Sequence, residues 1–255
     1  MKPVKVKVIV PVYRPLNELE QASLAQTVRV LSRYPIVLLH PEDMDISDFK
    51  AKHPSLESLG VSREWIGGRN GIAGYNRMCL SASFYELFAD CEYILICHTD
   101  AWIFSDELEA WCDKGYDYVG APWVRRAIYN LPLVKQLMTL RRRFCGTSDR
   151  QRLYGKVGNG GLSLRRVDSH IKGCIEYAST IEEFLSHRHH MFNEDVFWAT
   201  VPTPFSYPTE AEALRFAFDT NPRYCYRLMG NKLPFGCHSW TKPKMYRFWR
   251  NIIKL

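Results

Sequence analysis

The sequence lacks the short motifs that mark several large enzyme classes. It contains no GxGxxG, no GxxxxGK[ST], no HExxH and no GxSxG. Dinucleotide-binding, P-loop, zincin and serine-hydrolase functions are therefore without the residues that their chemistry requires. Internal repeats and low-complexity segments are also missing, which excludes a repeat protein or a disordered scaffold.

Long apolar runs and paired cysteines are absent too. No stretch reaches the roughly 18 apolar residues of a membrane span. The eight cysteines are scattered without a CxxC pair, so no zinc knuckle or thioredoxin site is indicated. The N-terminal MKPVKVKVIVPVY places lysines before a short apolar run, as a signal peptide does, but a small-residue cleavage site does not follow. We therefore expect a cytoplasmic protein with reduced thiols.

What is present is the composition of a soluble α/β protein. Of the 255 residues 46% are hydrophobic and 24% are charged, and 34 Lys+Arg against 27 Asp+Glu give a net charge of +7 that favours anionic partners. Strand-like and helix-like segments alternate, which predicts a single α/β domain with a mainly parallel sheet flanked by helices. The expected strands are Val4 to Val12, Ile36 to Leu39 and Tyr93 to Cys97, and the expected helices are Glu18 to Tyr34, capped by Asn17, and Gly71 to Phe88.

A carboxylate interrupts an apolar region in EYILICHTDAWIF, residues 92 to 104. In a parallel sheet the ligand crevice lies beyond the carboxyl ends of the strands. Asp100 follows a predicted central strand directly, so it is a candidate ligand-binding residue. The alternative is an aspartate that caps a turn.

The region from 124 to 153 is strongly basic, and we interpret it as an inserted helical or mobile loop rather than a linker. Its cationic residues are Arg125, Arg126, Lys135, Arg141, Arg142, Arg143, Arg150 and Arg152. The glycine turn and strand of GKVGNGGLSLRR follow it, and then comes the polar and aromatic segment HRHHMFNEDVFWAT.

Four short stretches, VPVYRP, HTDAW, GNGG…FNED and PFGCHSW, occur in an order that resembles the nucleotide-sugar glycosyltransferases with a GT-A domain. More closely, GYNRMCLSASFYELF, YILICHTDAWIF, GNGGLSLR, NEDVFW and PFGCHSW are similar to a family of proposed glycosyltransferases that is catalogued as a domain of unknown function. The resemblance spans about residues 6 to 240. It implies a nucleotide-binding half at about 1–123 and an acceptor half at about 154–240. The basic insert at about 124–153 lies between them, and a tail at 241–255 follows.

The resemblance also implies roles for individual residues on the donor side. The residues expected to bind the nucleotide or the donor sugar are Pro11, Val12, Tyr13, Arg14, Tyr75, Asn76, Arg77, Thr99, Asp100, Gly160 and Gly161. For the two glycines the alternative is simply a tight turn.

A divalent cation, Mn²⁺ or Mg²⁺, is expected as the cofactor, held by Asp100 and His238 as the family pattern implies. The sequence departs from the Asp-x-Asp pattern at one position, where His98 stands in place of the first aspartate. Arginines acting on the diphosphate are therefore an alternative to the metal, with Arg69, Arg77 and Arg165 as candidates. For His238 the other interpretation is a hydrogen-bonded, buried histidine beside Trp240.

The acidic pair of NEDVFW is the candidate for catalysis. An inverting transfer needs a base within hydrogen-bond reach of the acceptor hydroxyl. By resemblance we assign that role to Asp195, with Glu194 second. Asn193 followed by two acids also suits a helix N-terminus, and both functions are compatible.

The C-terminal KPKMYRFWRNIIKL combines an apolar helical stripe with basic residues, as interfacial helices do. A peripheral membrane contact would involve Phe248, Trp249, Arg247 and Arg250. The alternative is a helix that packs its stripe on the core.

Together these features predict a hexosyl-type glycosyltransferase. It would transfer a sugar from a nucleotide donor, a UDP-sugar, to a saccharide or lipid-linked saccharide in surface-polysaccharide or glycolipid synthesis, at the inner face of the membrane. One alternative is a catalytically silent nucleotide- or carbohydrate-binding module on the same fold. Nucleic-acid binding rests only on the basic insert and scattered aromatics, so we do not expect a nucleic-acid partner.

Overall fold

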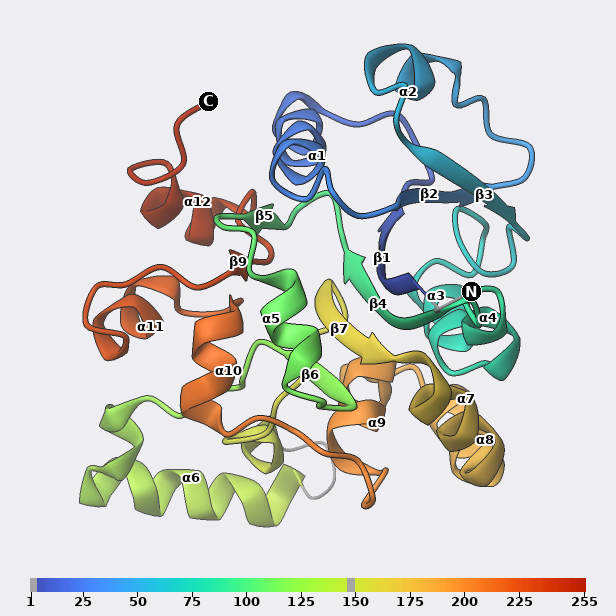
Figure 1. Ribbon diagram of the computed structural model, residues 1–255. Helices are drawn as coiled ribbons and strands as arrows, with labels where there is room; N and C mark the ends of the chain where they lie inside the picture. The colour runs from blue at the N-terminus through green and yellow to red at the C-terminus, as the bar shows by residue number, and fades with distance from the viewer. Residues whose placement is uncertain (1–3, 146–149) are drawn as a thin grey trace.

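A six-stranded sheet forms the centre of the molecule in the computed structural model, which describes residues 4–145 and 150–255 (Figure 1). The first four strands in the spatial order β3-β2-β1-β4-β7-β6 are parallel, and β7 runs antiparallel to both its neighbours. The predicted mainly parallel sheet is thus confirmed. The strands are β1 (Val4–Pro11), β2 (Ile36–Pro41), β3 (Glu57–Val61), β4 (Cys91–Cys97), β6 (Tyr118–Gly120) and β7 (Leu162–Arg166).

Alternate residues of the central strands face two separate cores. In β1, Val8 and Val10 contribute to one apolar cluster, while Ile9 belongs to the cluster on the opposite face. Because both faces are covered, the strands are almost continuously apolar, as is usual for a buried parallel sheet.

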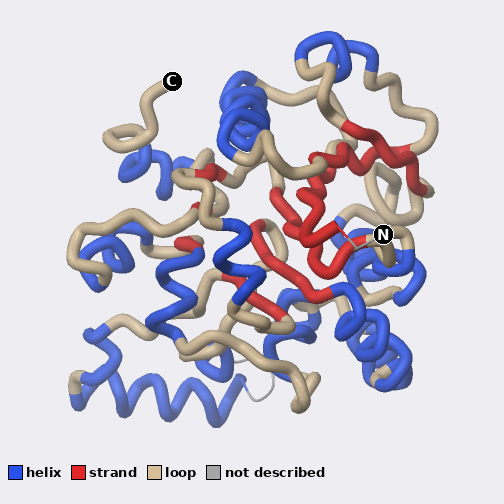
Figure 2. Tube along the Cα trace, viewed as in Figure 1, coloured by secondary structure: helices blue, strands red, loops and turns tan. Residues whose placement is uncertain are grey.

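Helices cover both faces of the sheet (Figure 2). On one face lie α1 (Glu18–Val30), α5 (Leu108–Asp113) and α10 (Glu210–Phe216), and on the other lie α3 (Ile72–Cys79), α4 (Ala82–Glu86), α7 (Val167–Glu176), α8 (Ala178–Ser186) and α9 (Glu194–Thr200). The short α2 (Ser47–Lys52) joins β2 to β3. The predicted cap of α1 is present, because Asn17 and Glu20 form a reciprocal capping box.

The prediction of a single helix from Gly71 to Phe88 is wrong in one respect. The chain forms two helices there, α3 and α4, and Ser81 between them is extended. The break leaves the carbonyl of Cys79 without a helical partner. The hydroxyl of Tyr85 and the indole N–H of Trp198 both donate to that carbonyl, at 2.8 and 3.0 Å. Tertiary hydrogen bonds therefore replace the helical one.

A second, three-stranded sheet lies beside the first, in the order β5-β9-β8. Its strands are β5 (Trp102–Ile103), β8 (Ala217–Phe218) and β9 (Gly236–Cys237), and α11 (Pro222–Leu228) and α12 (Pro243–Trp249) pack nearby. This small sheet brings the chain near residue 238 next to the loop that follows β4. Two distant parts of the sequence, the loop after β4 and the segment after β9, therefore lie side by side at the predicted ligand-binding edge.

The predicted membrane role of the tail is not supported at its central residue. Trp249 is fully buried, with its ring 5.5 Å from that of Phe104, and so it is unavailable to a lipid surface. Phe248 is half-buried against Tyr226, whereas Arg247 and Arg250 are exposed. The apolar stripe of the tail packs on the protein, as the alternative interpretation had it.

The described part of the basic insert is largely helical. It contains two short 3-10 turns, Ala127–Asn130 and Arg150–Leu153, and the helix α6 (Pro132–Cys145), while residues 146–149 lie outside the described residues. Figure 1 shows α6 along one edge of the molecule, away from the main sheet. Of the helices described, none has the length and apolar character needed to cross a membrane.

Candidate active site

A cavity of about 920 Å³ opens beyond the carboxyl ends of β1 and β4. Its lining comes from the loops after these two strands, from α3, from the turn before β7, from the start of α9 and from the segment after β9. The volume suits a nucleotide-sized ligand. Sheet topology therefore accounts for the location, since this edge is where open α/β sheets bind ligands.

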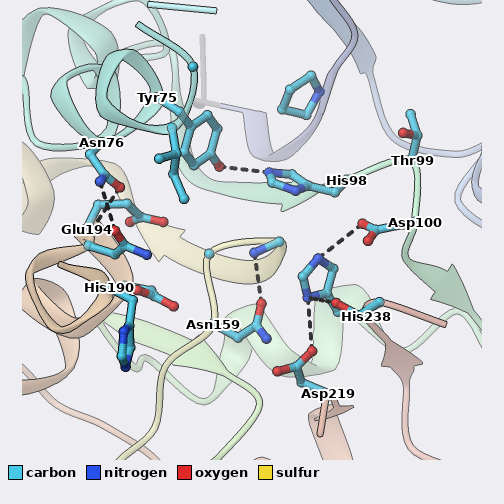
Figure 3. A pocket seen from close by; sticks show the side chains of 18 of the residues that line it. Tyr75, Asn76, His98, Thr99, Asp100, Asn159, His190, Glu194, Asp219 and His238 are labelled. Carbon is cyan, nitrogen blue, oxygen red and sulfur yellow. Dashed lines mark hydrogen bonds and ion pairs between the residues drawn. The ribbon is translucent and has the colours of Figure 1, made fainter. Parts of the chain in front are cut away.

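Two histidines and one aspartate meet on one side of this cavity (Figure 3). His98 and Asp100 follow β4, and His238 follows β9. One ligand atom from each of the three residues lies within 4.8 Å of the others, and the Nε2 atom of His238 is 3.1 Å from the Asp100 carboxylate. His98, which stands in place of the first aspartate of the family pattern, thus belongs to the same cluster as the two predicted metal ligands.

Further polar groups orient both imidazoles. The Nδ1 atom of His238 is 3.2 Å from the carboxylate of Asp219, and the Nε2 atom of His98 is 2.9 Å from the hydroxyl of Tyr75. A carboxylate on the far nitrogen is a usual support of a metal-ligating histidine, and the hydroxyl of Tyr75 holds the ring of His98 in a comparable way. The residues around the cluster therefore also fit a metal site.

Burial disfavours the charged form of each of the three side chains, and the charges of neighbouring groups determine the direction in which each pKa shifts. Burial and the charge of His238 lower the pKa of His98 to about 4. In His238 the carboxylates of Asp100 and Asp219 outweigh burial and raise the pKa to about 10. Despite burial, the histidines hold the pKa of Asp100 well below its ordinary value. The protein groups alone form an ion pair beside a neutral imidazole, and a metal ion would take the place of the proton on His238.

The donor set fits a divalent cation. A carboxylate oxygen and two imidazole nitrogens within 4.8 Å can bind one ion and leave open positions for phosphate oxygens. Two nitrogen donors favour Mn²⁺ over Mg²⁺, which prefers oxygen ligands. The cluster could therefore hold a metal ion.

The acidic pair stands at the N-terminus of α9. The predicted cap by the side chain of Asn193 is not formed. Instead the backbone N–H of Glu194 donates to the Oδ1 atom of Asn76, at 3.2 Å, and the amide of Asn76 donates to Asn193, at 3.1 Å. Both polar atoms of Asn76, predicted to contact the donor, therefore join α3 to α9.

Glu194 is buried in an ion pair. Its carboxylate lies 2.9 Å from the guanidinium of Arg165, which is fully buried and also donates to the hydroxyl of Tyr85. The alternative role of Arg165 as a diphosphate ligand is therefore wrong, because its charge is engaged inside the protein. A Cβ atom on Gly160 would lie 2.0 Å from Glu194, so glycine at this position makes room for the carboxylate.

Asp195 is only partly exposed and lines the cavity. Burial, followed by the nearby charge of Glu194, raises its pKa to about 7. A carboxylate with such a pKa can accept a proton near neutral pH, as a general base must. Both carboxylates line the cavity, but Glu194 is buried in an ion pair with Arg165, whereas Asp195 is partly exposed.

The turn before β7 supports the metal cluster directly. The backbone N–H of His98 donates to the carbonyl of Gly161, at 2.8 Å. A Cβ atom on Gly161 would lie 2.0 Å from the Nε2 atom of His238. Gly161 therefore allows His238 to approach, in addition to lining the cavity as predicted.

Most of the predicted donor-site residues line the cavity, and two do not. Those in the lining are Pro11, Tyr13, Arg14, Tyr75, Asn76, Thr99, Asp100, Gly160 and Gly161. Val12 points into the apolar core, because successive residues of an extended chain face opposite sides. Arg77 is exposed and outside the lining, since it is rotated by about 100° from Asn76 around α3.

Sequence reasoning missed several residues of the cavity, namely Glu20, Trp123, Asn159, Asp219, Ser239 and Lys242. For Asp219 a signal existed, since an acid ends the apolar run ALRFAF just as Asp100 follows the run in β4. In the sequence Lys242 belongs to the tail at 241–255. Its location depends on the small sheet, which the sequence does not reveal.

The fold is similar to that of solved glycosyltransferases. An active-site mutant of LgtC matches with a TM-score of 0.57 and 12% identity over 98% of this chain and 97% of the other. The galactosyltransferase LgtC in complex with donor and acceptor sugar analogues matches with a TM-score of 0.55 and 13% identity, again over 98% of this chain and 97% of the other. Mouse xyloside xylosyltransferase 1 in its apo form matches with a TM-score of 0.54 and 11% identity, over 92% of this chain and 97% of the other. At these identities the likeness shows the GT-A fold.

The sequence itself matches no curated protein. It does match a family described as "Protein of unknown function (DUF5672)", over residues 60–238. The matched region runs from the end of β3 to the His238 of the cluster, and so includes most of the cavity lining. The chain belongs to the DUF5672 family.

Proposed function

We propose that this protein is a glycosyltransferase that moves a sugar from a nucleotide donor, a UDP-sugar, to a saccharide or lipid-linked saccharide in surface-polysaccharide or glycolipid synthesis. The observation that carries the proposal is one cavity with a metal-competent cluster, His98, Asp100 and His238, and a carboxylate of raised pKa, Asp195. The GT-A fold of the similar structures supports it.

In this proposal the half at about 1–123 binds the donor. Pro11 and Tyr13 line the cavity at the end of β1, where the nucleoside would lie. Mn²⁺ on the cluster would supply positive charge for the diphosphate as it leaves. Lys242 lines the same cavity and offers a second positive charge to those phosphates.

On the acceptor side, in the half at about 154–240, Asp195 acts as the base. It takes the proton of an acceptor hydroxyl while the hydroxyl oxygen forms a bond to the anomeric carbon. The bond from that carbon to the diphosphate oxygen breaks, and the nucleoside diphosphate leaves with the electron pair. Attack opposite to the leaving group inverts the configuration of the anomeric carbon.

Calorimetric titration of UDP tests the donor site, with Mn²⁺ and with EDTA, on wild type, Asp100→Ala and the control Asp48→Ala. Asp48 is an exposed aspartate of α2 that is outside the cavity lining. We expect wild type and the control to bind UDP only with Mn²⁺, and Asp100→Ala to lose at least about tenfold in affinity.

Binding in EDTA that is indifferent to Asp100 would contradict the metal–nucleotide site, and no UDP binding in either buffer would remove the UDP-sugar proposal. The alternative, a silent binding module, predicts affinity without turnover. Release of UDP from UDP-sugars in the presence of Mn²⁺, with wild type and Asp195→Asn, separates the two. A wild type that binds UDP and never releases it from any sugar donor favours the module.

A further inference from the structure

The outer face of α6 is an exposed apolar stripe. Its members are Leu133, Leu137, Leu140 and Phe144, with 75%, 67%, 51% and 84% of their surfaces exposed. At about 100° per residue these four positions fall within an arc of about 60°. Single exposed apolar residues are common, but four large ones in line on a helix face indicate a surface that is covered in use.

A second face of α6, about 110° around the helix from the stripe, holds the helix to the protein. Val134 and Met138 are half-buried on that side, and the side chain of Gln151 donates to the carbonyl of Met138, at 2.9 Å. The stripe lies outside this inner face, and its four side chains are exposed. Figure 1 shows α6 at the margin of the molecule, with its long side open.

Positive charge flanks the stripe. The sequence has no Asp or Glu between Asp117 and Asp149. On α6, Arg141 and Arg143 are exposed, and helical spacing puts them on opposite flanks of the stripe, about 80° to either side. Lys135 is exposed too, but on the far side of the helix from the stripe. An apolar face with cationic flanks and no acidic residues is complementary to an anionic lipid surface.

We propose that α6 is a membrane-docking helix, which lies flat on an anionic lipid surface with Leu133, Leu137, Leu140 and Phe144 inserted among the acyl chains. The guanidinium groups of Arg141 and Arg143 then lie at the level of the lipid phosphates. This assigns the membrane contact to the basic insert instead of the C-terminal tail, whose Trp249 is buried.

Docking through α6 has a consequence for the acceptor, which rests on the proposed function. A second cavity of about 460 Å³ is lined by Met138 and Arg141 of α6. It shares three lining residues, Trp123, Thr220 and Met245, with the first cavity. A saccharide anchored in the membrane beside α6 therefore has a short route to the active site, which favours a lipid-linked acceptor.

Co-sedimentation with vesicles tests the docking without donor or acceptor, so its outcome is independent of the proposed reaction. The probes are vesicles of phosphatidylcholine alone and of phosphatidylcholine with one third phosphatidylglycerol. We expect wild type to bind the anionic vesicles, and the double variant Leu137→Glu/Leu140→Glu to bind at least about tenfold more weakly. The double variant Arg141→Gln/Arg143→Gln should weaken binding to anionic vesicles and reduce its salt dependence.

The matched control is Ile175→Glu on α7, an apolar residue that is 66% exposed, and it should bind as wild type does. Unchanged melting temperatures would show that the variants are folded, as expected for exposed positions. Three results would overturn the proposal: no binding of wild type to anionic vesicles, loss of binding in Arg247→Glu/Arg250→Glu of the tail but not in the α6 variants, or a wild-type dimer that the α6 variants abolish in light scattering.

Discussion

At the scale of single residues, the Arg165–Glu194 pair is the interaction on which the site depends most. Both side chains are almost completely buried, with 0% and 3% of their surfaces exposed. A buried charge that loses its partner costs far more than an exposed one. The pair also holds the start of α9, and so the carboxylate of the next residue, Asp195, in position.

We therefore expect Glu194→Gln to lower the free energy of unfolding by roughly 3 to 5 kcal/mol, because the charge of Arg165 would remain buried and unpaired. Urea denaturation followed by circular dichroism measures this. The exposed pair Arg63–Asp43, at 2.7 Å, provides the control, and Asp43→Asn should cost less than about 1 kcal/mol. Similar losses in the two variants would contradict the structural role of Glu194.

Asp195 leads to a prediction about pH. Its pKa of about 7 lies above the ordinary value of 3.8. The folded protein therefore binds this proton more tightly than the unfolded chain, and stability is lost as pH rises from about 4 to about 7. In Asp195→Asn this loss is absent. We expect the variant to exceed wild type by on the order of 4 kcal/mol at about pH 8 and to equal it near pH 4.

The control for that measurement has the opposite sign. In Asp117 burial is outweighed by hydrogen bonds from Ser169 and Ser206, so its pKa is lowered. This carboxylate stabilises the fold above its unfolded pKa and loses that effect as pH falls. Asp117→Asn should therefore be less stable than wild type at about pH 8, with a smaller difference near pH 4. A pH-independent effect of Asp195→Asn would refute the raised pKa.

At the scale of elements, two amphipathic helices carry similar patterns and have different surroundings. Periodicity predicts that one face of a helix is apolar, but it does not predict what covers that face. The stripe of α12 is covered by the protein itself, since Trp249 lies among Phe104, Phe218 and Phe248. The stripe of α6 is exposed. From the sequence the pattern of the tail was compatible with either outcome, whereas the basic insert was interpreted only as a helical or mobile loop.

The tail is tested by Trp249→Ala, which should lower the free energy of unfolding by roughly 3 to 5 kcal/mol, as removal of a large buried aromatic does. Denaturant titration measures the loss. Leu255→Ala, at a residue that is 72% exposed, should leave stability unchanged. If Trp249→Ala kept full stability and lost vesicle binding instead, the tail would be the membrane contact.

The sheet and its loops were easier to predict than the helix boundaries. Apolar runs such as β2 and β4 are buried on both faces, and such runs are characteristic of parallel strands, so Asp100 could be assigned to the ligand edge. The break between α3 and α4 depends on Tyr85 and Trp198, whose side chains donate to Cys79. Hydrogen bonds from so far along the chain are not encoded in local spacing.

At the scale of the whole molecule, the site is assembled from the entire length of the chain. Arg14 follows β1 and Asp100 follows β4. Asp195 lies at the start of α9, and Lys242 immediately precedes α12. Motifs predicted the first three, because each stands at the end of a recognisable strand or helix. Lys242 and Asp219 reach the cavity through the small sheet, whose two-residue strands leave almost no periodic signal.

Lys242 provides the test of that assembly. It lines the cavity, with its ammonium group 2.8 Å from the hydroxyl of Ser239, so its charge should act on the diphosphate and not on the nucleoside. In the presence of Mn²⁺ we expect Lys242→Ala to weaken UDP binding by about tenfold and to leave uridine binding unchanged. Lys244→Ala, an exposed lysine two residues along that is outside the lining, should bind both ligands as wild type does. Calorimetry on the three proteins separates an effect of charge from an effect of packing. Equal losses of affinity for UDP and uridine would mean that Lys242 only supports the cavity wall. A loss of affinity confined to UDP would identify the small sheet as the element that completes the phosphate site.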